Sequence, residues 1–100
     1  MILYSVEISL NSEVSDKWIQ WMKRKHIPDV LKTNMFSNVN VFKNLDDTSN
    51  STYTLQYELD NIEKYLNYKN KFSGMLQKDH TKNFKNQFSS KRTLFIKIPD

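Results

Sequence analysis

The chain lacks cysteine altogether and holds one glycine and two prolines in 100 residues. Without cysteine there are no disulfides, thiol nucleophiles, zinc–thiolate sites or iron–sulfur clusters, so packing, aided by any partner subunit, must stabilise this short chain. The single glycine, Gly74, excludes glycine-rich phosphate-binding loops and dinucleotide-binding motifs, and no nucleophile-elbow motif is present. Nucleotide chemistry is therefore disfavoured, and we expect no cofactor.

Long apolar runs are also missing. No stretch approaches the roughly 20 apolar residues that a membrane-spanning helix needs, and the N-terminus, MILYSVEISL, has neither a basic leader nor a small-residue cleavage site. We therefore expect a cytoplasmic protein with no membrane partner. Hydrophobic residues still make up 38% of the chain and charged residues 26%, which predicts one folded domain over residues 1–100.

The chain carries a formal net charge of +4, and the whole excess lies in its second half. Lysines dominate residues 61–88, where the only acidic residues are Glu63 and Asp79. This pattern predicts a basic helical surface, which could bind nucleic acid with an affinity that falls steeply as salt is added. The planar guanidinium that suits phosphate and base recognition occurs only at Arg24 and Arg92, so we favour a solvated helix surface over a nucleic-acid site.

The first half of the chain predicts a strand followed by a helix. Apolar and polar side chains alternate over residues 2–10, as in a strand buried on one face. A helix then begins near Glu13, after the capping pair Asn11–Ser12, and carries an apolar stripe along one side. Pro28 donates no backbone N–H, so the helix should end or kink there and restart through about Lys32.

Two strands follow and form a predicted hairpin. Residues 38–45 alternate weakly, whereas residues 53–59 give the strongest strand pattern of the chain. The polar segment 46–51 is the predicted turn between them.

The remaining residues predict a second helix and a last strand. Asp60 to Glu63 has the spacing of a capping box, and the apolar helical pattern that follows is interrupted near Ser73–Gly74. We therefore expect a long helix in two pieces, with Phe84 and Phe88 on its last turns and the approach to the sheet. Residues 93–98 alternate as a C-terminal strand.

The predicted order, strand–helix–strand–strand–helix–strand, is that of the α+β, ferredoxin-like βαββαβ fold. In this fold a four-stranded antiparallel sheet carries both helices on one face, which fits the apolar side of the predicted strands. The other face is predicted to be polar and suited to water or to a wet dimer interface. Its side chains are Ser5, Glu7, Ser9, Thr54, Gln56, Glu58 and Lys97.

Several distinctive segments are spread along nearly the whole chain. They are the opening strand, Trp18–Met22, His26–Leu31, Met35–Phe36, Thr52–Tyr57, His80, Phe84, Phe88 and Arg92–Leu94. Together they resemble a small uncharacterised bacterial family, domain of unknown function family 4286. That family is similar to the dimeric α+β barrel superfamily. The resemblance implies that two ferredoxin-like protomers associate through their sheets and that a pocket lies between sheet and helices. It brings no established activity.

The segment W-x4-H-x-P, from Trp21 to Pro28, also resembles related barrels that include cofactor-free monooxygenases and proteins that degrade small molecules. His26 is the sharpest candidate within it, because a neutral imidazole can accept a proton or orient a polar ligand. The alternative is a structural histidine that bonds freed helix carbonyls or packs beside the apolar stripe. Alternation places Tyr4 and Tyr57 on the helix-facing side of neighbouring strands, so the candidate pocket is His26, Tyr4, Tyr57 and Trp21.

His80 and Arg92 form a second candidate cluster, because His80, Phe84, Phe88 and Arg92 recur at steps of four residues. Arg92 could bind a carboxylate ligand through its planar fork. The alternative, which we favour, is an ion pair between Arg92 and Glu58, Asp60 or Asp79. Neither an H-x3-H nor an H-E-x-x-H spacing is present, so we expect no metal site.

These observations favour a homodimeric binding or interaction module with a small-ligand pocket between the first helix and the sheet. The alternative is a cofactor-independent, monooxygenase-like enzyme acting on a small organic substrate, with His26 and either Tyr4 or Tyr57 at its centre. The enzyme requires His26 and a tyrosine hydroxyl to converge on a cavity connected to solvent, whereas the binding module does not.

Overall fold

The computed structural model of the chain describes residues 1–48 and 51–100. Strands and helices follow the predicted order, and each of the two helical segments contains two α-helices joined by a π-helical turn. In chain order the elements are β1 (Ile2–Leu10), a 3-10 turn (Ser12–Val14), α1 (Ser15–Trp21), a π-helical turn (Met22–His26), α2 (Ile27–Leu31), β2 (Asn38–Lys43), β3 (Thr52–Leu59), α3 (Ile62–Tyr68), a second π-helical turn (Lys69–Ser73), α4 (Gly74–Asn83) and β4 (Phe88–Ile96).

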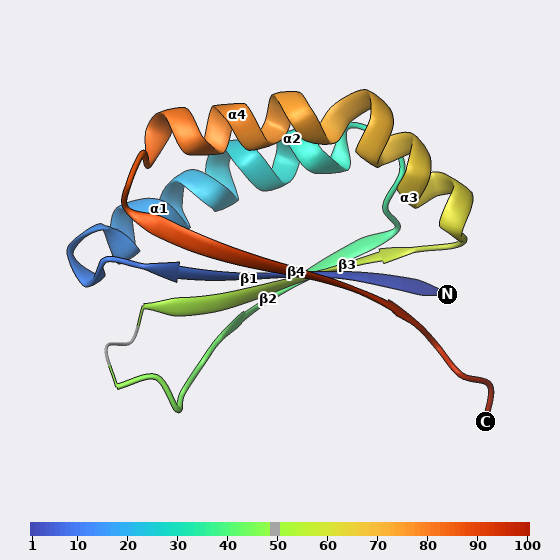
Figure 1. Cartoon of the computed structure of the whole chain (residues 1–100), viewed down its shortest axis with the longest axis horizontal. Helices are drawn as coiled ribbons and strands as arrows, with labels where there is room; N and C mark the ends of the chain where they lie inside the picture. Colours follow the sequence, from blue (N-terminus) through green and yellow to red (C-terminus); the bar gives the residue numbers. More distant parts are fainter. Residues whose placement is uncertain (49–50) are drawn as a thin grey trace.

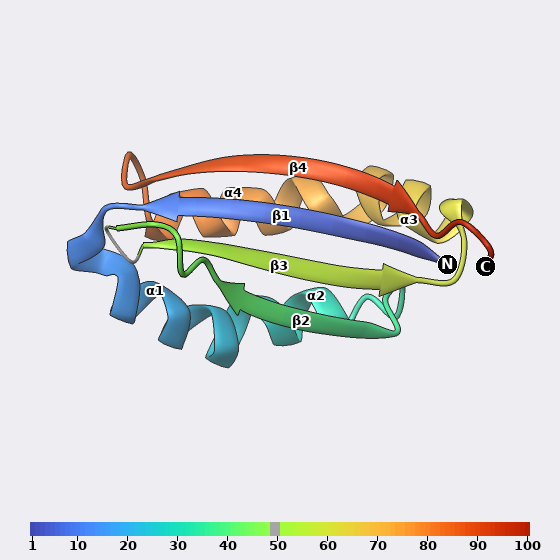
Figure 2. The same cartoon turned by 90° about the horizontal axis from the view of Figure 1, so that it is seen from below.

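One antiparallel sheet with the strand order β2-β3-β1-β4 carries the helices on a single face (Figure 1). Seen from below, the sheet lies in front of the helices and its opposite face is uncovered (Figure 2). The predicted ferredoxin-like α+β fold is confirmed. Within the described part of the chain, no helix is long and apolar enough to cross a membrane.

Alternation along the strands separates an apolar face from a polar one, because successive side chains of a strand point to opposite sides. Tyr4 lies opposite Tyr57 in the register of the sheet, and the next residue, Ser5, lies opposite Gln56. Both tyrosines are buried under the helices, whereas Ser5 and Gln56 are half-buried on the uncovered face. The most deeply buried side chains, at 2% exposure or less, are Trp18, Met22, Val30, Leu55, Leu59 and Phe84.

The first helix confirms the predicted break at Pro28 but begins differently. The Asn11 side chain makes no capping hydrogen bond, so that predicted cap is wrong: the Val14 N–H bonds instead to the Asn11 carbonyl oxygen (3.1 Å) in the 3-10 turn. Proline lacks an N–H for the carbonyl four residues earlier, and its ring clashes with that carbonyl. The π-helical turn Met22–His26 lies immediately before α2, which holds Pro28 in its first turn. The wider turn accommodates the proline and places His26 at the junction.

The second helix is capped one residue later than predicted. The Asn61 side chain accepts a hydrogen bond from the Lys64 N–H (3.0 Å), while the Asp60 carboxylate pairs with Lys64 Nζ (3.0 Å). The predicted interruption is confirmed. Ser73 Oγ donates a hydrogen bond to the Lys69 carbonyl oxygen (2.8 Å), and such a bond competes with the helix ladder where the π-helical turn occurs.

β4 begins earlier than the sequence predicts. Phe88 already lies in the strand rather than on a helical turn, and the strand ends at Ile96. Asn86 adopts a left-handed backbone with φ of 62°, which asparagine tolerates better than most residues. This conformation turns the chain from α4 into the sheet within a few residues, so β4 starts sooner.

β2 and β3 form the predicted hairpin, with Val39 opposite Tyr57. β2 is more exposed than β3 because it lies at one edge of the sheet. This exposure agrees with the weak alternation of its sequence. The polar turn predicted over 46–51 includes residues 49 and 50, which lie outside the described residues.

Candidate functional site

A cavity of about 160 Å³ lies between the helices and the sheet. β1 and β3 form its floor, the π-helical turn of the first helix and α4 cover it, and β4 lines its side. Gln77, Thr81, Ser90 and Arg92 line the cavity and are exposed, so it opens to solvent between α4 and β4. The sequence predicted a pocket between the first helix and the sheet. In the structure the cavity lies under both helical segments.

Tyrosine side chains form much of the inner wall. Tyr4 and Tyr57 come from neighbouring strands and their ring centroids are 6.1 Å apart, while Tyr68 of α3 lies at the same distance from Tyr4. Burial raises the pKa of all three hydroxyl groups above the ordinary value, although Arg92 opposes this effect at Tyr4. The tyrosines are therefore protonated at neutral pH and can donate or accept hydrogen bonds.

Arg92 lies at the mouth of the cavity on β4, in register with Val6 of β1. Its Nε donates a hydrogen bond to the Tyr4 hydroxyl oxygen (3.1 Å), and its Nη1 donates one to Ser90 Oγ (3.1 Å). Both partners are neutral, so the arginine charge is not balanced by either contact.

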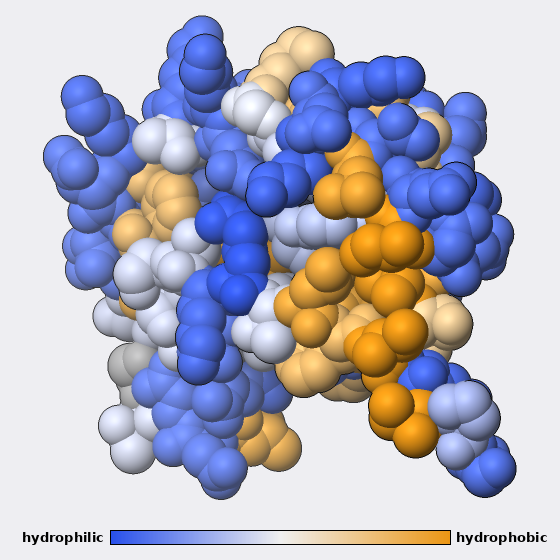
Figure 3. Space-filling view, turned by 45° about the vertical axis from the view of Figure 1, so that its right-hand side comes forward, coloured by the Kyte–Doolittle hydropathy of each residue, from blue (hydrophilic) through white to orange (hydrophobic). Residues whose placement is uncertain are grey.

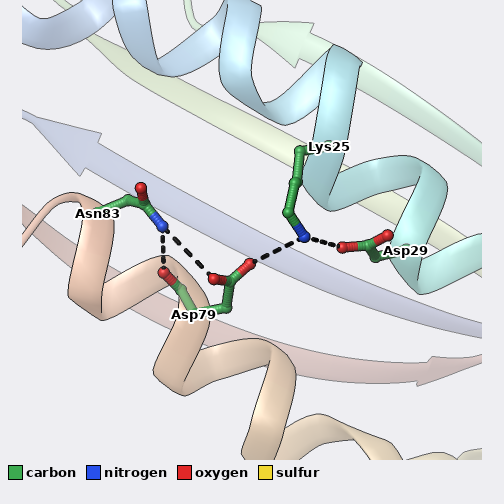
Figure 4. A network of polar contacts seen from close by, with 4 residues as sticks. All are labelled: Lys25, Asp29, Asp79 and Asn83. Carbon is green, nitrogen blue, oxygen red and sulfur yellow. Dashed lines mark hydrogen bonds and ion pairs between the residues drawn. The ribbon is translucent and has the colours of Figure 1, made fainter.

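The predicted ion pair of Arg92 is wrong, because each candidate carboxylate has another partner. Glu58 accepts a hydrogen bond from the Asn38 side chain (2.8 Å) on the uncovered face of the sheet, and Asp60 pairs with a lysine of α3. Asp79 pairs with Lys25 (3.6 Å), as Figure 4 shows.

Lys25 joins the two helices above the cavity. Its Nζ lies 2.6 Å from Asp29 Oδ2 and 3.6 Å from Asp79 Oδ2, and Asn83 Nδ2 donates to the Asp79 carbonyl oxygen (2.8 Å) (Figure 4). The hydrogen bond with Asp29 raises the pKa of Lys25, and the same bond lowers the pKa of Asp29. Asp29 and Asp79 are thus both paired with Lys25, and Arg92 forms no ion pair among the described residues.

His80 on α4 has a fixed hydrogen-bond partner. The Trp18 indole donates from Nε1 to His80 Nε2 (2.9 Å), and both side chains are buried. The acceptor role of Nε2 requires the His80 proton to be on Nδ1. Burial lowers the pKa of His80 to about 4, so the ring is neutral at physiological pH.

His26, in contrast, has an unsatisfied atom. Its Nδ1 is buried and has no hydrogen-bond partner among the described residues. The His26 ring lies against Trp21 (centroids 5.4 Å apart) and 5.6 Å from the His80 ring, and burial lowers its pKa to about 4. The structure thus brings together two histidines that the sequence assigned to separate clusters, and both line the cavity.

Of the four residues in the predicted pocket, His26, Tyr4 and Tyr57 line the cavity, whereas Trp21 does not. Trp21 packs behind the wall, with its ring 5.8 Å from His80 and 5.4 Å from Phe84. Its ring also packs against the imidazole of His26, with the centroids 5.4 Å apart.

Tyr68, Ser90 and Phe88 also line the cavity, and the sequence pattern does not predict them there. Residues two apart in a strand share a face, so an earlier start of β4 would have grouped Phe88, Ser90 and Arg92. No sequence signal distinguishes Tyr68 from Tyr65, since both lie on the apolar side of the same helix.

Across residues 1–48 and 51–100, no group of three histidine or acidic side chains is placed to hold a metal ion. The polar groups that line the cavity are imidazole, phenol, hydroxyl, amide and guanidinium groups.

Comparison with protein families gives a match over residues 1–98 to a family described as domain of unknown function (DUF4286). The chain belongs to the DUF4286 family. No curated protein matches the sequence at a significant level.

Solved structures similar to this DUF4286 chain share its fold. HapK from Hahella chejuensis is 9% identical with a TM-score of 0.73, and the match covers 100% of this chain and 95% of HapK. SnoaB from Streptomyces nogalater, described as a cofactor-independent oxygenase, is 9% identical with a TM-score of 0.71 and coverage of 99% and 94%. A dimeric ferredoxin-like protein from an uncultured marine organism is 13% identical with a TM-score of 0.72 and coverage of 100% and 97%.

The geometry of this DUF4286 member supports two kinds of chemistry. Arg92 offers a positive charge and free N–H donors at the mouth of the cavity, which suit an anionic group. His26 lines the same cavity, and its buried, unpaired Nδ1 can accept a proton or a hydrogen bond from a group that reaches it.

Proposed function

We propose that this protein is a homodimeric binding module that holds a small organic molecule in the cavity between the helices and the sheet. The observation that carries the proposal is a cavity that opens to solvent and is lined by His26, whose buried Nδ1 has no hydrogen-bond partner among the described residues. An unsatisfied buried polar atom costs about 1–3 kcal/mol, and a bound ligand that pairs with it recovers part of that cost.

A pair of neighbouring serines on β4 provides the test. Ser90 lines the cavity, whereas Ser89 is on the opposite face of the strand. Ser90→Leu adds apolar volume at the cavity wall, so we expect it to abolish binding of compounds found in a fragment screen by protein NMR. Ser89→Leu adds the same volume elsewhere and should leave binding unchanged. Equal binding by wild type and Ser90→Leu would contradict the proposal.

The proposed homodimer is supported by an exposed apolar surface on α3 and the end of β4. Figure 3 shows hydrophobic side chains gathered on this side of the molecule, close to the C-terminal tail. The exposed apolar residues of α3, of the end of β4 and of the tail after it include Ile62, Leu66, Leu94, Ile96 and Ile98. Contiguous apolar surfaces of this kind are common at interfaces between proteins, and one structural relative is described as dimeric.

Light scattering tests the dimer. We expect wild type to have twice the 12.0 kDa mass of one chain, and Ile96→Asp to shift the protein toward the monomer. Leu45→Asp is the matched control, because Leu45 is 86% exposed but lies in the segment after β2, away from this surface. A monomeric wild type at all concentrations would contradict the dimer.

A second candidate is a cofactor-independent enzyme in which His26 removes an acidic proton from the bound molecule. It is favoured by the same unpaired Nδ1 and by the position of Arg92, which would stabilise the resulting anion. In this step the C–H or O–H bond breaks, its electron pair stays on the substrate, and Nδ1 takes the proton.

Hydrogen exchange tests this second candidate without requiring knowledge of later steps. For a ligand that carries an acidic C–H, wild type in D₂O should speed deuterium incorporation, measured by NMR, and His26→Gln should not. Binding without exchange would support the binding module and contradict the enzyme.

A further inference from the structure

We infer that the ligand of this cavity is a one-ring organic carboxylate, bound with its carboxylate on Arg92 and its ring among the tyrosines. The inference rests on the proposed function, since it assumes that the cavity is the binding site. It adds the charge, the size and the orientation of the ligand.

The charge of the cavity lining indicates the charge of the ligand. Arg92 is the one charged side chain among the described residues that line the cavity, and its two side-chain hydrogen bonds go to the neutral groups of Tyr4 and Ser90. A guanidinium has five N–H donors in a planar fork, so most remain available for a carboxylate in this arrangement. A cation at the mouth with no acidic partner there favours an anionic ligand over a neutral or cationic one.

The uncharged interior of the cavity determines the orientation of the ligand. Burial keeps His26 and His80 neutral at physiological pH and the tyrosines protonated, so the inner wall carries no charge. A carboxylate placed there would lose its hydration without meeting a positive charge. The charged end of the ligand therefore belongs at the exposed mouth, beside Arg92, and the uncharged end belongs inside.

Volume and wall chemistry argue for a single ring. The cavity of about 160 Å³ is close to the roughly 150 Å³ of an engineered protein cavity that binds benzene. Its wall includes the rings of Tyr4, Tyr57, Tyr68 and Phe88, which suit stacked or edge-on contact with another ring. The size of the cavity and its aromatic wall therefore suit a ligand with one ring.

The unpaired Nδ1 of His26 specifies one further feature. Because the imidazole is neutral, this nitrogen accepts a hydrogen bond when the ring proton is on Nε2. A hydroxyl or N–H group on the ring of the ligand would supply the missing donor. Hydroxybenzoates are therefore better probes than benzoate itself.

The test compares charged and neutral probes of the same shape. Benzoate, hydroxybenzoates and benzamide are titrated into the wild-type protein, with binding followed by protein NMR. We expect the carboxylates to bind at least about tenfold more tightly than benzamide, because a charge-assisted pair with arginine is stronger than a neutral hydrogen bond. This comparison requires no substitution and is unaffected by folding defects.

Variants of arginine then test whether Arg92 causes the tighter binding of carboxylates. Arg92→Gln should reduce carboxylate binding to the level of benzamide, and Arg92→Lys, which keeps the charge but loses the fork, should retain part of it. Arg24→Gln is the matched control, because Arg24 is exposed on the first helix and does not line the cavity. It should bind carboxylates as wild type does.

Equal affinity for benzoate and benzamide, or no effect of Arg92→Gln, would overturn the inference. If only neutral or larger compounds bind, and Ser90→Leu blocks them, the inference fails while the proposed function stands. If no compound of either charge binds in a way that Ser90→Leu blocks, both fail.

Discussion

On the helix-covered side of the sheet, two neighbouring regions use the same residue types in different ways. We call the first the Trp18 cluster; it consists of Trp18, His80, Tyr53 and Ser15. The indole donates to His80 (2.9 Å), and Ser15 Oγ and the Tyr53 hydroxyl share a buried hydrogen bond (2.8 Å). The second region is the cavity, where Arg92 lacks a carboxylate among the described residues and His26 Nδ1 lacks any partner there.

The difference separates structural polar groups from candidate functional ones. A histidine whose nitrogen pairs with a buried indole, as His80 does beside the cavity, contributes to packing. An unpaired buried nitrogen such as His26 Nδ1 lowers stability, which points to a role other than packing. Unsatisfied groups are therefore the better guide to the binding site, and the following experiments test whether the two regions differ as the structure indicates.

The largest expected effect is that of pH. Both histidines have a pKa lowered by burial from 6.5 to about 4, so between these values the unfolded chain binds more protons than the folded one. Stability is therefore full above pH 6.5 and is lost as the pH falls toward 4. At about 1.4 kcal/mol per pKa unit, a shift from 6.5 to about 4 lowers the free energy of unfolding by roughly 3 to 4 kcal/mol for each histidine.

Urea unfolding at several pH values measures this loss, and NMR titration assigns it to each ring. Asp29 contributes mainly below this window, because its pKa lies below the ordinary value of 3.8. A His26 that titrates near 6.5 while His80 stays neutral would show that water solvates the cavity, and would sharpen the contrast between the regions.

The next largest effect is expected for Trp18→Ala. Trp18 has no exposed surface, and removing a buried tryptophan costs about 3–5 kcal/mol through lost burial and the cavity left behind. Trp21→Ala is the matched control and should cost less, because Trp21 is only half-buried. Equilibrium unfolding in urea compares them, and equal losses would show that the Trp18 cluster is not the better packed region.

His80→Phe should lower the free energy of unfolding by about 1–3 kcal/mol. The substitution fills similar volume but leaves the Trp18 indole N–H buried without its acceptor. His80→Gln, which restores an acceptor, should recover part of the loss. An unchanged stability in His80→Phe would mean that the indole finds another partner.

The smallest effect is expected for His26→Leu, which should leave stability unchanged or raise it by about 1 kcal/mol. The substitution removes a buried nitrogen that has no partner among the described residues. Thermal unfolding of wild type, His26→Leu and His80→Phe under the same conditions compares their stabilities directly. A loss as large as that of His80→Phe would show that His26 is also a structural histidine.

The sequence predicts the fold well because the information is local. Alternation over β1 and β3 and the break at Pro28 specify the main elements, and the confirmed order then defines a known arrangement. The start of β4 was missed because it depends on Asn86, whose left-handed backbone has no unique sequence signal.

The candidate site is only partly predictable. Strand alternation places Tyr4 and Tyr57 under the helices, and helical spacing places His26 on the inner side of the first helix. The meeting of His26 with His80, and the neutral partners of Arg92, depend on how the two helices pack across the sheet. Such contacts between distant segments are not encoded in any single spacing.

The most direct test of the central claim, that the cavity is a binding site, is a crystal structure of the wild-type protein soaked with a hydroxybenzoate at neutral pH. The account predicts a ring between Tyr4, Tyr57 and Phe88, a carboxylate within hydrogen-bond distance of Arg92, and a hydroxyl paired with His26 Nδ1. A cavity filled by rearranged side chains, with the compound absent from it, would contradict the claim.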